Sequence, residues 1–452
     1  MKKIKLLLTY ILVLTTFFTS VVPVYAKQQN KELKEPKISA KTAIVMDAQT
    51  GQVLYNKKMN KIKYPASLTK LMTVLLAIEN CKLNEKVKFS VEAAYGIEPG
   101  SSSIGIMPNE ILTVEQCLYG MMLESANEVC SAIAEHISGS VEEFAKLMNK
   151  RAKELGCKNT NFTNANGLHN DNHYTTAYDL ALILKQALSY PEFRKVASTR
   201  NSRIPKTNLN PARELWNHHK MIKYPSGTYS IAPLTVTSGK TAYTTKAKTC
   251  LSTSATNGDM ELICIVMDDA GVAVYTDTKA LFEYAFEKYE HAYPLQSYET
   301  MPTEDMNLIA HNFFLLLDPD RIDLSVNKDY MVTIPKDADM SELTTVVTKN
   351  IDEQTKTLGT IDILYQNQKI GSTSIDYKDF MASPITVAKP KTEDNFRTIV
   401  DKIPKQILIM GIAFVIFFIL FIFFIFYWNL SRKRRSLRFY NKKKYIKKRH
   451  FD

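Results

Sequence analysis

The sequence lacks the patterns that mark metal-dependent hydrolases and repeat proteins. Its eight histidines form no H-E-x-x-H motif, and its six cysteines follow no zinc spacing. Internal repeats and low-complexity tracts are also absent. We therefore expect no metal site and no cofactor. His169 and His173, which flank a loop, are expected to have surface or hydrogen-bonded structural roles.

Net positive charge is confined to the two ends of the chain. The formal net charge of +12 includes +3 from Lys2, Lys3 and Lys5 and +10 from residues 429–452, which leaves about −1 for everything between. The basic composition therefore does not indicate a nucleic-acid partner, and none is expected. It indicates a segment that flanks a membrane.

Both ends also carry an apolar run. Residues 1–26 combine three lysines, an apolar stretch and the small-residue site Val24-Tyr25-Ala26, the pattern of a secretory signal peptide. An uncleaved anchor is the alternative. Ile407–Trp428 holds 22 residues without a charge, and about 20 suffice for a transmembrane helix. We assign that helix to 406–428, with a buried core helix as the alternative.

The topology of the chain follows from these two runs. By the positive-inside rule, the basic residues 429–452 are expected to form a cytoplasmic tail of a single-pass cell-membrane protein. The body of the chain then lies outside the cytoplasm, where disulfides are permitted, so its cysteines are expected either as disulfides or as buried thiols. At 452 residues the chain is expected to hold two or three folded units plus attachments.

The first unit, over residues 37–293, mixes strand and helix patterns. Two short strands around Asp47–Gly51 predict a hairpin. Apolar residues at three- and four-residue steps predict helices after Leu68, over Val114–Leu123 and over Val141–Leu155. Strand-like runs and a last helix follow; they span Leu251–Thr253, Leu262–Met267 and Thr278–Lys288. This order predicts an α+β fold with an antiparallel sheet flanked by helices.

Residues 295–383 predict a small all-β domain without catalytic candidates. The expected strands are short, alternating and separated by polar turns, and they cover Tyr330–Ile334, Thr344–Val347, Gly359–Tyr365 and Lys369–Ile375. The polar, proline-containing residues 384–405 predict a stalk.

Three short motifs carry the chemistry. Ser67-Leu68-Thr69-Lys70 opens a predicted helix, and its spacing puts Ser67 and Lys70 on one helical face, close enough for the amine to take the hydroxyl proton. Ser125-Ala126-Asn127 and Lys240-Thr241-Ala242 follow, the latter on a predicted edge strand. This order is that of the S-x-x-K, S-x-N and K-T-G elements of penicillin-binding proteins and class A β-lactamases. No G-x-S-x-G elbow surrounds Ser67.

Over roughly residues 37–290 the chain resembles the low-molecular-mass D-alanyl-D-alanine carboxypeptidases, serine peptidases that also bind penicillin. The resemblance rests on these motifs and on longer stretches, among them Pro65–Met72, Gly100–Ser102, Met122–Glu128, Asn161–Leu168 and His173–Leu180. It implies a β-lactamase/transpeptidase-like domain that removes the terminal D-alanine from peptidoglycan stem peptides ending in D-Ala-D-Ala. It also implies acylation by β-lactam antibiotics.

The resemblance assigns roles by position. Ser67 is the expected nucleophile, Lys70 the base, Ser125 a proton relay to the leaving amine, and Asn127 a partner of the substrate amide and of Lys70. A lysine has an ordinary pKa of about 10.4, so Lys70 must be kept neutral by burial and by a nearby positive charge.

Substrate binding is assigned to the third motif. The resemblance implies that Lys240 and Thr241 bind the terminal carboxylate of the substrate. The backbone N–H groups of Ser67 and Tyr243 would form the oxyanion hole.

Three features depart from the family pattern. Ala242 stands where glycine is usual, and its methyl group is expected to crowd a substrate lying along the strand. Val274 stands where an arginine is common, which leaves Lys240 to hold the carboxylate more nearly alone. Relatives often end in an amphipathic helix instead of a full span.

Two other functions remain open from the sequence. A β-lactamase shares the S-x-x-K and K-T-G motifs but needs fast deacylation. A catalytically weakened penicillin- or peptidoglycan-binding or sensing protein is the reading that Ala242 and Val274 favour, whereas the intact Ser67, Lys70 and Asn127 weigh against it.

Overall fold

A computed structural model describes residues 33–296, 324–352 and 354–377 of the chain. The predicted signal peptide (1–26), stalk (384–405), transmembrane helix (406–428) and tail (429–452) lie outside the described residues. Within those ranges, no helix combines the length and the apolar character needed to cross a bilayer.

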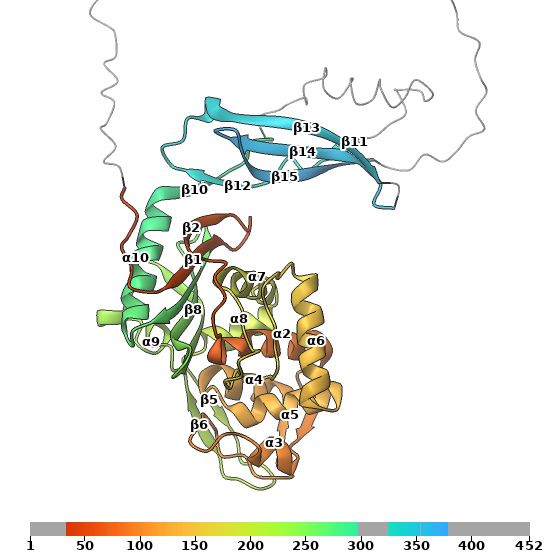
Figure 1. Ribbon diagram of the computed structural model, residues 1–452, viewed down its shortest axis with the longest axis vertical. Coiled ribbons are helices and arrows are strands. Elements are labelled where there is room, and N and C mark those ends of the chain that lie inside the picture. The colour runs from red at the N-terminus through yellow and green to blue at the C-terminus, as the bar shows by residue number, and fades with distance from the viewer. Residues whose placement is uncertain (1–32, 297–323, 353, 378–452) are drawn as a thin grey trace, which may run out of the picture. The chain divides into compact units, whose positions relative to one another are not determined.

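A five-stranded antiparallel sheet forms the centre of the first unit (Figure 1). The strand order is β2-β1-β9-β8-β7, so the edges are β2 and β7. The bounds are β1 Thr42–Asp47, β2 Val53–Lys57, β7 Thr235–Thr244, β8 Lys248–Thr256 and β9 Glu261–Asp269. The prediction that Lys240 lies on an edge strand is confirmed.

The predicted hairpin joins β1 to β2. Asp47 accepts hydrogen bonds through its side chain from the backbone N–H groups of Gln49 and Thr50, at 2.8 and 2.9 Å. Gly51 has a φ of +78°, a left-handed conformation that glycine adopts without strain. The polar turn predicted from Asp47–Gly51 is therefore fixed by its own side chains.

Alternating side chains of the sheet serve two separate cores. Ile44, Met46 and Ile265 belong to the core on one face, whereas Val45 and Val266 belong to the core on the other. Successive residues of a strand point to opposite faces, which explains this division. Figure 1 shows α10 beside one face and α2, α4, α5, α6, α7 and α8 beside the other.

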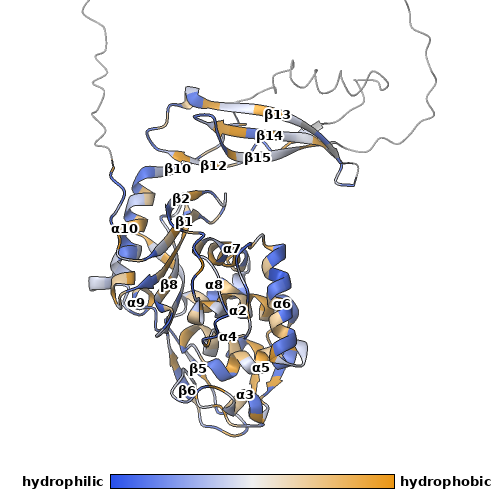
Figure 2. Cartoon of the chain, viewed as in Figure 1, coloured by the Kyte–Doolittle hydropathy of each residue, from blue (hydrophilic) through white to orange (hydrophobic). Residues whose placement is uncertain are grey.

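Most helices begin or end at recognisable signals. A capping box of Thr113 and Gln116 starts α4, which confirms the predicted helix over Val114–Leu123. The other bounds are η1 Ala66–Thr69, α2 Lys70–Asn80, α3 Val91–Tyr95, α4 Val114–Leu123, α5 Asn127–Ser138, α6 Val141–Glu154, α7 Ala177–Ala187, α8 Pro191–Ser198, α9 Lys220–Lys223 and α10 Ala273–Lys288. Figure 2 shows α6 as largely hydrophilic and α2 and α4 as more hydrophobic, as expected for an outer and two inner helices.

Three shorter strand pairs follow, and β12 of the last pair shares a small core with residues of the next sheet. β3 pairs with β4, β5 pairs with β6, and β10 pairs with β12. Their bounds are β3 Lys86–Lys88, β4 Ile111–Thr113, β5 Asn201–Ile204, β6 Arg213–Trp216, β10 Tyr289–Ala292 and β12 Val332–Pro335.

A separate four-stranded antiparallel sheet follows, in the order β11-β15-β14-β13. Its bounds are β11 Leu324–Val326, β13 Leu343–Asp352, β14 Thr357–Tyr365 and β15 Gln368–Tyr377. The predicted strands Thr344–Val347, Gly359–Tyr365 and Lys369–Ile375 lie inside β13, β14 and β15. The fourth predicted strand, Tyr330–Ile334, corresponds to β12, which pairs with β10 instead.

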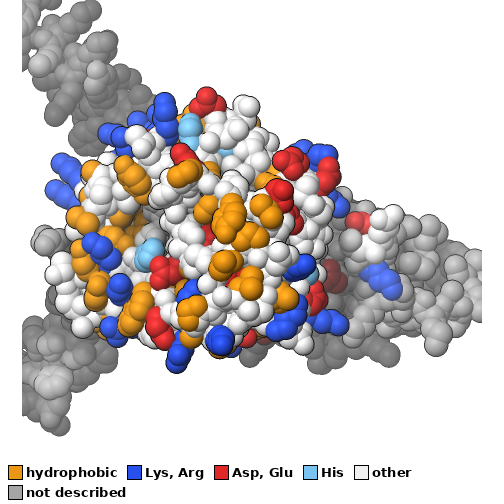
Figure 3. Space-filling model, turned by 90° about the horizontal axis from the view of Figure 1, so that it is seen from below, with side chains coloured by type: hydrophobic (Ala, Val, Ile, Leu, Met, Phe, Trp, Pro, Cys, Tyr) orange, Lys and Arg blue, Asp and Glu red, His pale blue; other side chains and the backbone are white. Residues whose placement is uncertain are grey.

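The surface around α3 carries exposed hydrophobic side chains. Val91 and Tyr95 are 56% and 62% exposed. Figure 3 looks onto the side where α3, β5 and β6 lie in Figure 1, and it shows hydrophobic side chains interspersed with charged ones. Single exposed apolar residues of this kind are ordinary on protein surfaces.

Candidate active site

Ser67 lies in a strained turn immediately before a buried helix. The 3-10 turn η1 contains it, and α2 begins three residues later at Lys70. Ala66, directly before Ser67, has a φ of +47°, which is uncommon for a residue with a side chain. Strain of this kind is typical of residues that present a reactive group, because the surrounding structure must hold them in place.

Lys70 is the centre of the site. Its Nζ lies 3.1 Å from Ser67 Oγ, 2.7 Å from Asn127 Oδ1 and 2.6 Å from the backbone oxygen of Asn166. The side chain is fully buried, and this burial lowers the pKa of its amine below the ordinary range. The amine of Lys70 therefore loses its proton at a lower pH than the amine of a free lysine does.

The three contacts of Lys70 match what a neutral amine can make. Two of the partners, on Asn127 and Asn166, are carbonyl oxygens, which only accept hydrogen bonds. In a neutral amine they take the two N–H groups, which leaves the lone pair for the third partner, whereas a charged amine donates to all three. The third partner is the Ser67 hydroxyl, which is able to donate. The arrangement is suited to removing a proton from Ser67.

Ser125 occupies a sharp turn between α4 and α5. Its φ is +61°, and its hydroxyl is buried without a hydrogen-bond partner among the described residues. The backbone N–H of Asn127 donates to the carbonyl of Ser102 at 2.9 Å, so the Gly100–Ser102 loop lies against the start of α5. An unpartnered buried hydroxyl in a strained turn suits a group that waits for a ligand.

Lys240 brings a second buried amine to the site. It lies on β7, its side chain is 1% exposed, and its Nζ donates to the carbonyl of Thr241 at 3.0 Å. Burial, and then the positive charge of Lys70, lower its pKa to about 7. The positive charge of Lys70 is thus close enough to disfavour the charged form of Lys240. Tyr243, further along β7, is 64% exposed.

The structure therefore joins Ser67, Lys70 and Asn127 by direct hydrogen bonds and couples Lys240 to them through charge. Ser125 lies two residues before Asn127, and Thr241 and Tyr243 follow Lys240 on the edge strand. The catalytic and binding roles assigned to these residues stay predictions.

Sequence reasoning gave no role to the backbone of Asn166 and Gly167. Asn166 holds Lys70 through its carbonyl oxygen, and Gly167 has a φ of +87°. A Cβ atom on Gly167 would lie 1.9 Å from the carbonyl oxygen of Ala66, so only glycine allows this loop to approach the Ser67 turn. A main-chain contact leaves no side-chain signature in the sequence.

His173 supports the Ser67 turn through a chain of hydrogen bonds. The N–H of Thr163 donates to its Nδ1 at 3.0 Å, so the proton of the neutral ring is on Nε2, 2.8 Å from Thr69 Oγ1. The Thr69 hydroxyl in turn donates to the carbonyl of Ala66 at 2.8 Å. Burial lowers the pKa of His173 to about 4. The expected hydrogen-bonded role of this histidine is confirmed.

The two substituted family positions are both buried. Ala242 is 5% exposed, pairs with Cys250 of β8 and belongs to the core on the helical side of the sheet. Val274 is fully buried in the other core, in the first turn of α10. The effects of Ala242 and Val274 on substrate binding stay predictions.

The fold and this constellation together define a class. An α+β domain that places a serine, two buried lysines and an asparagine beside one edge strand has the architecture of penicillin-binding transpeptidases. Structures of known proteins agree. Penicillin binding protein 5 from Haemophilus influenzae has a TM-score of 0.60 at 24% identity and covers 76% of this chain and 98% of its own. A D-alanyl-D-alanine carboxypeptidase from Mycobacterium tuberculosis has a TM-score of 0.51 at 25% identity and covers 57% and 94%.

Sequence comparison makes the assignment specific. The family model for D-alanyl-D-alanine carboxypeptidase matches residues 29–271. D-alanyl-D-alanine carboxypeptidase DacF of Bacillus subtilis is 37% identical over 297 residues, which cover 63% of this chain and 72% of the relative. DacA of Escherichia coli is 30% identical over 378 residues, 80% and 86% of the two chains. The chain belongs to the D-alanyl-D-alanine carboxypeptidase family of serine-type hydrolases.

Proposed function

We propose that this chain removes the terminal D-alanine from peptidoglycan stem peptides ending in D-Ala-D-Ala, through an acyl-enzyme on Ser67, and that β-lactams acylate the same serine. The observation that carries the proposal is the set of contacts of Lys70. Two carbonyl oxygens hold its amine at 2.6 and 2.7 Å and direct it at Ser67 Oγ.

In the acylation step, Lys70 accepts the Ser67 proton while Oγ attacks the carbonyl carbon of the penultimate D-alanine. The backbone N–H groups of Ser67 and Tyr243 stabilise the developing oxyanion; a lost donor in such a hole typically costs about 100-fold or more in rate. Ser125 passes a proton to the leaving D-alanine amine and takes up the proton held by Lys70, so Lys70 is neutral again. Water then attacks the ester carbonyl, with Lys70 again as base, and regenerates Ser67.

Lys240 connects substrate binding to the state of the base. A bound terminal carboxylate stabilises the charged form of Lys240, whose pKa in the free enzyme is about 7. The resulting positive charge disfavours protonation of nearby Lys70. Binding of a substrate with a free carboxylate thus helps to keep the base neutral, which favours an exopeptidase.

The proposal is tested with the purified full chain, fluorescent penicillin and a peptide ending in D-Ala-D-Ala. Labelling and D-alanine release are both expected, and both should disappear in Ser67→Ala. Ser198→Ala, a substitution on the surface of α8, is the matched control and should retain both. Labelling without D-alanine release would indicate a binding or sensing protein instead. Absence of labelling would contradict an acyl-enzyme.

The membrane anchorage is also part of the proposal. The uncharged run 407–428 and the basic residues after it support a single-pass protein with an exported body. After alkaline extraction of membranes, the full chain is expected in the pellet, and a chain truncated after residue 405 in the supernatant. Equal extraction of both would contradict an anchor in this segment.

A further inference from the structure

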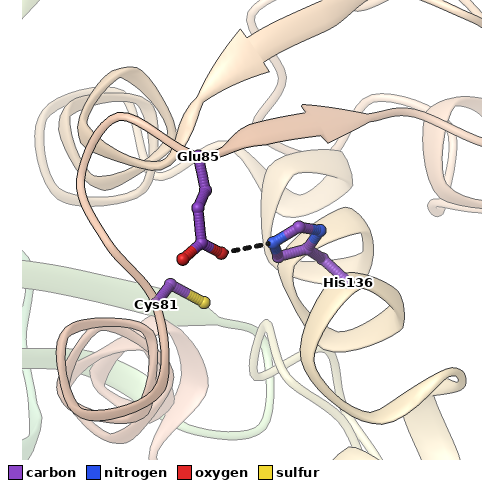
Figure 4. Close-up of side chains that lie close together, drawn as sticks. All are labelled: Cys81, Glu85 and His136. Atoms are coloured by element: carbon purple, nitrogen blue, oxygen red, sulfur yellow. Dashed lines mark hydrogen bonds and ion pairs between the residues drawn. The ribbon is translucent and has the colours of Figure 1, made fainter.

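Three side chains with metal-ligating atoms converge away from Ser67. Cys81, Glu85 and His136 each direct one ligand atom into a common space, and these atoms lie within 4.8 Å of one another. Figure 4 shows the Cys81 thiol and the Glu85 carboxylate facing the imidazole of His136. Cys81 follows the last residue of α2, Glu85 directly precedes β3, and His136 lies in the last turn of α5.

Cys81 differs from the other cysteines of the chain. All six are free thiols; the other five are buried, and Cys81 alone is part-exposed. The five buried thiols act as small core side chains. Cys81 packs at the edge of the core, keeps partial solvent access and has two further donor side chains beside it.

Glu85 is held in position by the main chain. The N–H of Lys82 donates to Glu85 Oε1 at 2.8 Å, and Oε2 lies 3.3 Å from His136 Nε2. These two contacts fix the direction in which the carboxylate points, as hydrogen bonds orient the ligands of metal sites.

We propose that Cys81, Glu85 and His136 bind a divalent cation of the zinc class, with water as the fourth ligand. One sulfur, one nitrogen and one oxygen donor suit Zn²⁺ and Co²⁺, whereas Ca²⁺ and Mg²⁺ prefer oxygen alone. Tetrahedral zinc with bonds of about 2.0–2.3 Å places ligand atoms roughly 3.5 Å apart, so the three side chains must close by about 1 Å.

Binding of the cation breaks one covalent bond, the S–H bond of Cys81, and involves no redox step. The S–H bond of Cys81 breaks, its proton passes to solvent, and the sulfur donates its electron pair to the cation. Glu85 contributes a carboxylate oxygen, and His136 contributes the lone pair of one ring nitrogen.

The position of the cluster suggests what the cation would do. α2 begins with Lys70 and α5 begins with Asn127, and a 2.7 Å hydrogen bond joins these two residues. Cys81 and His136 lie at the opposite ends of the same helices. A cation would therefore tie the far ends of the two helices whose starts hold the base, roughly 16 Å away along α2. Its expected effect is on stability and not on the chemical step.

The test uses the purified full chain with its thiols reduced and its metals removed by a chelator. Zn²⁺ is expected to bind with one-to-one stoichiometry and, at a hundredfold excess over Kd, to raise Tm by roughly 5 to 10 °C. Co²⁺ is expected to give thiolate charge-transfer absorption. Ca²⁺ and Mg²⁺ are expected to change neither property.

Variants separate ligation from packing. Cys81→Ser should abolish the charge-transfer absorption, and His136→Ala and Glu85→Gln should weaken Zn²⁺ binding by about tenfold or more. Glu143→Gln removes an exposed, ion-paired carboxylate of α6 and is the matched control. Because the measured quantity is the metal-dependent rise in Tm, a general loss of stability in a variant does not mimic the result. A wild-type chain without the rise in Tm, or cobalt absorption that persists in Cys81→Ser, would overturn the proposal.

Discussion

Replacement of Gly167 by alanine should disable the site without touching any side chain that reacts. The added Cβ would lie 1.9 Å from the carbonyl oxygen and 2.4 Å from the carbonyl carbon of Ala66. These are main-chain atoms, so no side-chain rotation relieves the overlap. The Ser67 turn and the loop that contains Asn166 must therefore move apart. The backbone carbonyl of Asn166 is one of the two that hold the Lys70 amine, so this contact is weakened.

The loss of unfolding free energy in Gly167→Ala has two parts, which a control substitution at Gly156 separates. Gly167 has a φ of +87°, where a non-glycine residue costs about 1–2 kcal/mol. Overpacking against rigid neighbours adds about 1–3 kcal/mol. Gly156, at the end of α6, has nearly the same φ of +86°, and the nearest atom to an added Cβ is at 3.9 Å, an ordinary contact. Gly156→Ala therefore carries the first part alone.

The assay combines urea unfolding with the rate of fluorescent-penicillin labelling. Gly167→Ala is expected to lose about 2–5 kcal/mol of unfolding free energy and to label at least about fivefold more slowly, because one lost hydrogen-bond partner of a catalytic group costs about 1–3 kcal/mol. Gly156→Ala should lose about 1–2 kcal/mol and label normally. Equal stability losses and equal labelling rates in the two variants would refute the reasoning.

Further predictions concern Lys240, His173 and Ala242. Since the pKa of Lys240 is about 7, its positive charge is lost above that pH, and kcat/KM for carboxylate-ended peptides should fall as the pH rises through 7. Lys240→Arg should move this fall in kcat/KM to higher pH. A fall at the same pH in the variant would exclude Lys240 as its cause. The pKa of His173 is lowered from 6.5 to about 4, so the unfolded chain takes up the proton first and stability should fall by up to about 3 kcal/mol between pH 6.5 and 4. His173→Gln should flatten this part of the stability profile, and a profile as steep as that of the wild type would contradict the assignment. Ala242→Gly should cost about 1 kcal/mol in stability with kcat/KM changed less than about threefold; a tenfold gain would show that the methyl group crowds the substrate.

The sequence predicts those parts of the fold that local signals determine. The turn at Asp47–Gly51 and the helix over Val114–Leu123 are encoded by neighbouring residues, and the structure confirms both. The predicted strand Leu251–Thr253 proved to be part of the longer β8, whose residues 250–255 are buried. A strand buried on both faces has no alternation of polar and apolar residues by which to recognise its ends.

The motifs predict which side chains form the site, but not the long-range contacts that hold them. Ser67 and Lys70 are close because they are three residues apart on a helix, which a sequence reveals. The contact from Asn166 is made by the main chain, 96 positions away, and depends on Gly167 for space. The convergence of Cys81 with His136 arises from the packing of α2 beside α5, and no local spacing encodes it. Long-range contacts of both kinds require the tertiary structure.

Because of the way in which Lys70 is held, the reactive arrangement of Ser67 and Lys70 forms only in the folded chain. Its partners Ser67, Asn127 and Asn166 come from segments that meet only when η1, α5 and the loop before Gly167 have packed together. A partly folded chain contains the same serine and the same lysine, but it lacks the carbonyl oxygens that orient the amine and the burial that lowers its pKa. Covalent penicillin labelling therefore counts native molecules. The labelled fraction of a preparation measures how much of the chain has reached its folded state.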